Sequence, residues 1–164
     1  MQSRSFFRLG LPLALGLALH GCATAPSPSP PSLPAQALEL NPDTARNLIS
    51  AYRQAHGLSR VTLDGNLEKF AQRQADAMAS ADHLSHEVDG SLSKRLKGAD
   101  LARATAVENV SAGYHSVEDV FAGWRHSPGH DANLLDPAMR HMGIAAAVAP
   151  ATHYKTFWAL VMTN

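Results

Sequence analysis

The chain has 164 residues, of which 45% are hydrophobic and 17% charged, and this balance is typical of one globular domain. Fourteen basic residues match fourteen acidic ones, so the chain lacks the basic surplus of a nucleic-acid binder and the charge excess of a disordered acidic chain. The single cysteine, Cys22, excludes a disulfide within the chain and a cysteine-based zinc finger, whereas nine histidines leave metal or proton chemistry open.

The first 21 residues have the pattern of a secretory signal peptide. Arg4 and Arg8 precede an apolar run from Leu9 to Leu19. This run is too short to cross about 30 Å of hydrocarbon as a helix, but its length suits the apolar core of a signal peptide. We therefore expect residues 1–21 to be removed from the mature protein.

The end of this segment, Leu-His-Gly-Cys, resembles the bacterial lipobox, in which a cysteine after a small residue is lipid-modified and becomes the mature N-terminus. Cys22 is then the lipid attachment site; the alternative is an incidental thiol in a cleaved peptide. His20 departs from the pattern, because a small residue is usual there. Residues 22–39 are rich in proline and serine, which is typical of an extended tether. By resemblance to lipoprotein sorting signals, Ala23 indicates an outer-membrane anchor that faces the periplasm or the cell surface.

Residues 40–164 are predicted to form the folded domain. Asn41 and Pro42 favour the start of a helix that Gly57 ends. A second helix is expected after Asp64, because apolar residues then recur at helical spacing. A short extended segment, 58–63, joins the two helices.

A short helix is expected after Ser91, and Gly98 would end it. Its basic residues are interpreted as a solvated face; they are Lys94, Arg95 and Lys97. Residues 106–114 are predicted to form a strand. A further helix is expected from Ser116, with a break at Ser-Pro-Gly 127–129.

The last quarter of the domain holds two apolar runs, 142–148 and 154–162, separated by a turn at Pro150. They are predicted to form an antiparallel hairpin. Since almost every side chain in the second run is apolar, helices should cover both faces of the sheet. The pattern predicts an α+β domain, a three-layer α-β-α sandwich with a small antiparallel sheet between helices.

Three polar residues are candidates for chemistry. His86 and His130 are expected in loops after helices, and Glu108 lies on a predicted strand among apolar neighbours. Two imidazoles and a carboxylate can hold zinc or another divalent cation with one position open. The same three groups can also form a hydrogen-bonded cluster without metal, in which Glu108 orients a histidine. Their spacing of 22 residues matches no short-range metal motif.

Several segments in a fixed order resemble one protein family. They are MASADHLSH, ENVSAG, WRHSPGHDANLL, GIAAAV and FWALVM. Together they are similar to the CAP superfamily, which contains cysteine-rich secretory proteins, antigen-five and plant pathogenesis-related proteins, in its disulfide-free bacterial form. The resemblance runs from about Thr44 to the C-terminus.

The resemblance implies an α-β-α sandwich whose central cavity gathers two histidines and two acidic residues, sometimes around zinc or another divalent cation. His86, Glu108 and His130 match three of these four positions. The second acidic position falls on Ser127, a departure shared with the SPGH type of bacterial domain. Asp131 is a candidate replacement near the cleft.

Two functions remain open at this point. The first is an envelope-anchored binding module whose cleft takes a small ligand, lipid, peptide or cell-wall fragment, with or without a divalent metal; no nucleic acid is expected as a partner. The alternative is a metal-dependent peptidase or cell-wall hydrolase with Glu108 as base. The residues favour binding, because no separate base and no serine or cysteine nucleophile is recognisable. Asn109 is expected to hold neighbouring loops by hydrogen bonds rather than to act on a ligand.

Overall fold

The structure is a computed structural model that describes residues 38, 40–99, 101 and 104–164. The chain divides into two units, 1–33 and 34–164, and every described residue belongs to the second. The predicted signal peptide 1–21, the lipid attachment site Cys22 and the 22–39 tether, apart from Leu38, lie outside the described residues. Among the described helices, none has the length and apolar character needed to span a membrane.

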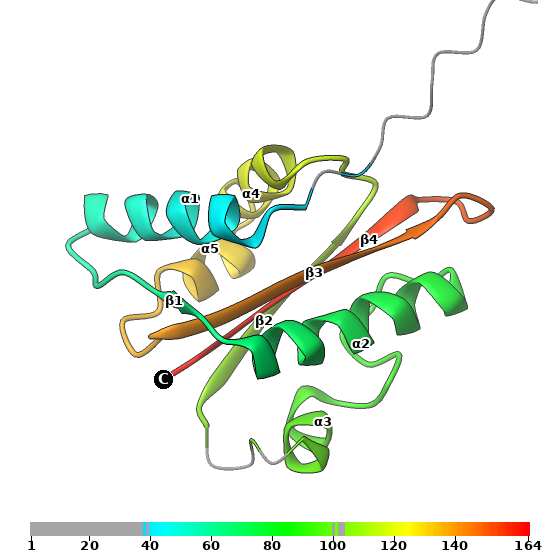
Figure 1. The fold of residues 1–164 in the computed structure, drawn as a ribbon, viewed down its shortest axis with the longest axis horizontal. Helices are drawn as coiled ribbons and strands as arrows, with labels where there is room; N and C mark the ends of the chain where they lie inside the picture. The colour runs from blue at the N-terminus through cyan, green and yellow to red at the C-terminus, as the bar shows by residue number, and fades with distance from the viewer. Residues whose placement is uncertain (1–37, 39, 100, 102–103) are drawn as a thin grey trace, which may run out of the picture. The chain divides into compact units, whose positions relative to one another are not determined.

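Helices and strands are interspersed along the described chain, which ends in two consecutive strands (Figure 1). In order they are α1 (Pro42–Ala55), β1 (Thr62–Leu63), α2 (Gly65–Ala81), α3 (Leu92–Gly98), β2 (Ala106–Ala112), α4 (Val117–Arg125), α5 (Pro128–Leu134), β3 (His141–Ala149) and β4 (Lys155–Thr163).

The strands form one four-stranded sheet in the order β1-β3-β4-β2. The predicted hairpin is confirmed, because β3 pairs antiparallel with β4. β2 pairs antiparallel with β4 on the other side, and β1 pairs parallel with β3. This order makes β2 an edge strand, so residues on it can contact loops from both faces of the sheet.

Helices cover both faces of the sheet, as the apolar strands predict (Figure 1). One core cluster joins α1, α4 and α5 to Trp158, Leu160 and Met162 of β4. The other joins α2 and α3 to Phe157, Ala159 and Val161 of the same strand. Alternate side chains of β4 thus enter opposite cores, and the expected α+β sandwich of three layers is confirmed.

Three of the predicted helix starts are confirmed by their caps. The Asn41 side chain accepts hydrogen bonds from the backbone at the start of α1, at 2.9 Å from the Asp43 amide. Asp64 does the same for α2, at 2.7 Å from the Asn66 amide. Ser116 caps α4. In each case a side-chain oxygen satisfies an amide that has no partner within the helix.

Two local predictions are wrong. The predicted break at 127–129 is confirmed, because α4 ends at Arg125. Pro128 then occupies the first turn of α5, where its fixed φ suits a helix and its missing N–H costs nothing. His130 therefore lies on a helix and not in a loop. The strand predicted over 106–114 ends at Ala112, because Gly113 adopts a left-handed φ of 84° and turns the chain.

Candidate functional site

The site is built on the edge strand β2, whose neighbouring side chains point to opposite layers. Glu108 meets α3 and the loop that precedes it. Asn109, the next residue, hydrogen-bonds to α5 on the other face. Since β2 is the last strand of the described sheet, beside β4, groups from both helical layers can approach at this edge.

His86 and Glu108 are in direct contact, as the hypothesis of a His/Glu cluster requires. His86 Nδ1 lies 2.9 Å from Glu108 Oε1. The Glu108 side chain is only 1% exposed, whereas that of His86 is 52% exposed. A carboxylate at Nδ1 places the proton of a neutral imidazole on that nitrogen and leaves Nε2 as an acceptor. The buried end of this pair is fixed, and the histidine ring meets solvent.

Arg95 is the third member of this cluster, and the prediction that it belongs to a solvated helix face is wrong. Its side chain is 6% exposed, and Nη2 lies 2.9 Å from both carboxylate oxygens of Glu108. Only the bond to Oε1 has good hydrogen-bond geometry; Oε2 is left without a partner. The buried carboxylate is thus paired with a cation, as a charge in a low-dielectric interior must be.

Arg95 also organises the loop that carries His86. Nη2 donates to the His86 carbonyl at 3.0 Å, and Nε donates to the Gly90 carbonyl at 2.9 Å. From α2, Gln74 Nε2 donates to the Ser85 carbonyl at 2.8 Å. The backbone on both sides of the His86 peptide is therefore held from two helices, which limits where the imidazole can move.

His130 is held near the same edge by an asparagine pair. Asn109 Nδ2 donates to the His130 carbonyl at 3.1 Å, and Asn133 Nδ2 donates both to Asn109 Oδ1 at 2.8 Å and to the Glu108 carbonyl at 3.1 Å. These bonds tie α5 to β2. Burial, and then the positive charge of His86, lower the pKa of His130 below 6.5. The pKa of His130 therefore depends on the charge of His86 as well as on burial.

This interaction predicts a pH effect. A folded pKa below 6.5 means that folded His130 binds fewer protons than the unfolded chain does. Its contribution to stability should be complete above about pH 6.5 and be lost as the pH falls through the folded pKa. In an imidazole NMR titration, we expect His86→Gln to raise the pKa of His130, because the like charge is gone. His83→Gln, in the same loop, should leave that pKa unchanged; equal shifts in both variants would contradict the assignment.

Neither Ser127 nor Asp131 supplies a fourth acidic ligand beside His86, Glu108 and His130. Ser127 precedes α5, and its hydroxyl makes no capping hydrogen bond. Asp131 Oδ1 accepts a 2.7 Å hydrogen bond from the Tyr52 hydroxyl of α1. This bond raises the pKa of Tyr52, with burial as the second cause. Asp131 therefore ties α5 to α1 rather than pairing with either histidine.

The residues in this arrangement do not fit a divalent cation at Glu108. No group of three His, Cys, Asp or Glu side chains in 40–99 and 104–164 lies in a position to hold a metal ion. Arg95 already supplies the positive charge beside the carboxylate, and Nδ1 of His86 is already paired with the Glu108 carboxylate. Zinc binding stays a prediction from the sequence.

Known proteins share this fold. An extracellular protein of Bacillus anthracis that contains a SCP domain superposes with a TM-score of 0.65 at 22% identity, over 75% of this chain and 40% of that one. An outer surface protein of Borrelia burgdorferi gives a TM-score of 0.67 at 19% identity, over 74% and 90%.

Sequence comparison gives a nearer relative. The uncharacterized protein YkwD of Bacillus subtilis is 31% identical over 99 residues, which are 59% of this chain and 38% of that protein. The chain thus matches well under half the length of this relative. Residues 46–162 match the family described as CAP, the cysteine-rich secretory protein family. Because this match covers nearly the whole described domain and agrees with the fold, the chain belongs to the CAP family.

Proposed function

We propose that this CAP domain is a ligand-binding module of the cell envelope and that His86, Glu108 and His130 line its binding cleft. The observation that carries the proposal is the half-exposed His86 ring held on a buried, arginine-paired carboxylate. A ring fixed in this way offers one nitrogen to a ligand at little entropic cost. A secreted or surface location is part of the proposal, since the structural neighbours are described as extracellular or outer surface proteins.

The ligand class is a small molecule, lipid, peptide or cell-wall fragment with a polar group that can bond to imidazole. His130 lies on α5 beside the other face of β2, and its lowered pKa favours the neutral ring near pH 7. A cleft with two histidines and a neutralised carboxylate suits an uncharged polar group, such as an amide or a sugar hydroxyl. Cell-wall fragments carry both groups, so they are the probe we choose.

The expected result is that soluble muropeptides bind the full chain and that His86→Ala weakens binding about tenfold, the effect of one lost hydrogen bond. Calorimetry measures the affinity. His83→Ala is the matched control, because His83 is an exposed histidine of the same loop. Equal affinity in wild type and His86→Ala would mean that muropeptides do not bind at this cleft.

The same calorimeter tests the metal hypothesis with zinc. Micromolar or tighter zinc binding that disappears in both His86→Ala and His130→Ala would show that the cleft binds a metal. Absence of heat in the wild type would show that the protein does not bind zinc. Because Arg95 is paired with Glu108, we propose ligand binding without a metal at that carboxylate.

A hydrolase has less support. Glu108 is committed to Arg95 and His86, so it is not free to act as a separate base. Within the described residues, no serine, threonine or cysteine side chain hydrogen-bonds to the ring of His86 or His130. Digestion of peptidoglycan by wild type but not by Glu108→Gln would favour the hydrolase over the binding module.

A further inference from the structure

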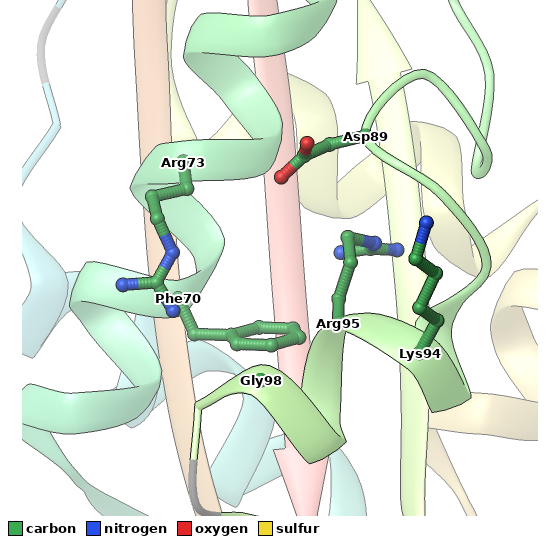
Figure 2. Close-up of a pocket in the computed structure, with 6 residues that line it drawn as sticks. All are labelled: Phe70, Arg73, Asp89, Lys94, Arg95 and Gly98. Atoms are coloured by element: carbon green, nitrogen blue, oxygen red, sulfur yellow. The ribbon is translucent and has the colours of Figure 1, made fainter.

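A separate pocket opens between α2, α3 and the loop before α3, and the cleft function does not account for it. Its volume is about 280 Å³. The residues that line it are Phe70, Arg73, Asp89, Lys94, Arg95 and Gly98 (Figure 2). Neither histidine of the cleft belongs to this lining, and Arg95 is the residue that the two sites share.

The pocket has an excess of positive charge. Arg73 reaches it from α2, whereas Lys94 and Arg95 reach it from α3 on the other side (Figure 2). Arg95 is neutralised by Glu108. Within the part of the chain that the structure describes, neither Arg73 nor Lys94 forms an ion pair within 4.0 Å. Asp89 is the one acid in the lining, so two cations face the pocket without a close counterion among the described residues.

Two of these cations are held in place by one aromatic ring. The guanidinium carbons of Arg73 and Arg95 lie 5.5 Å and 5.3 Å from the centroid of the Phe70 ring. Phe70 itself is buried. Each contact is a favourable cation–π interaction. Since Arg95 is already paired with Glu108, Arg73 is the guanidinium at this ring that, among the described residues, has its charge available for an anion.

Lys94 is positioned by the backbone opposite it. Gly90 has a φ of 89°, and a Cβ built there would lie 3.3 Å from Lys94 Cδ. The lysine stem therefore rests against Gly90, where a larger residue would crowd it. This contact limits where the lysine side chain can lie at the edge of the pocket, whose lining includes Lys94 (Figure 2).

We propose that this pocket is a second binding site and that it takes the oxyanion group, phosphate or carboxylate, of a small soluble ligand. Guanidinium and ammonium groups are the side chains that bind such groups by charge-assisted hydrogen bonds. Asp89 lies in the same lining and repels a bare anion, so it favours a ligand with a hydroxyl or amino group beside its oxyanion. This proposal does not depend on the function of the His86 cleft.

Titration of the full chain with inorganic phosphate, followed by amide NMR shifts, tests the proposal. Lys94→Gln and Arg73→Gln should each weaken phosphate binding about fivefold, since each removes one charged contact. Asp89→Asn should tighten it about two- to threefold, because a like charge is removed. Lys97→Gln is the matched control, since Lys97 is an exposed lysine of the same helix outside the pocket lining.

A parallel titration with acetate separates phosphate from carboxylate, and the tighter of the two identifies the group. His86→Ala should leave both titrations unchanged, which distinguishes this site from the cleft. The proposal is overturned if neither anion shifts the amides of the pocket at about 10 mM, a concentration that detects weak sites. It is also overturned if Lys97→Gln weakens binding as much as Lys94→Gln does.

Discussion

Replacement of Arg95 by methionine is expected to lower the free energy of unfolding by about 3–5 kcal/mol, the usual loss when one partner of a buried ion pair is removed. Methionine preserves the apolar stem of the side chain but leaves Glu108, with 1% of its side chain exposed, without its cation. The bonds to the His86 and Gly90 carbonyls are lost at the same time. Urea unfolding at pH 7 measures the change.

The control is Lys97→Met on the same helix, where an exposed side chain should change stability by no more than about 0.5 kcal/mol. The double variant Arg95→Met with Glu108→Gln should regain part of the loss, because the unpaired charge is removed together with its partner. If Arg95→Met alone costs less than about 1 kcal/mol, the pair is solvated and does not fix His86. His86→Ala removes the solvent-exposed partner of Glu108 and should lower ligand affinity more than it lowers the free energy of unfolding.

The overall fold follows from local signals in the sequence. Asn41, Asp64 and Ser116 each place an oxygen where the first amides of a helix need one, and a cap depends only on residues a few positions away. The apolar run that forms β4 predicts burial on both faces in the same local way. These signals suffice for helices, strands and layers.

The site depends on contacts that no local signal contains. Leu92, Arg95 and Leu96 share one face of α3 by helical spacing, which could have shown that Arg95 points inward. Its depth of burial depends on Glu108, 13 residues further along and on another element. Residue type alone allows a cluster in which Glu108 orients a histidine, but the 22-residue spacing does not show which histidine it is. Pro-Gly after Ser127 is compatible with two structures, because proline favours both the end of one helix and the first turn of the next.

Replacement of Gly143 by alanine is expected to have the other large effect, a loss of about 3 kcal/mol or more. Gly143 lies in β3, opposite Val161 of β4. A Cβ at this position would overlap the backbone of α2 at Leu67 and Glu68. Backbone atoms cannot rotate away as a side chain can, so the helix and the sheet must separate.

This separation should also reach the proposed binding cleft, because α2 carries Gln74, which holds the Ser85 carbonyl beside His86. The melting temperature and the muropeptide affinity of Gly143→Ala should therefore both be lower than those of the wild type. Gly65→Ala is the matched control: Gly65 opens the same helix, has no atom near its Cβ position, and should give equal or slightly higher stability. A Gly143→Ala protein that melts within about 2 °C of wild type would mean that α2 does not rest on β3 as the structure shows.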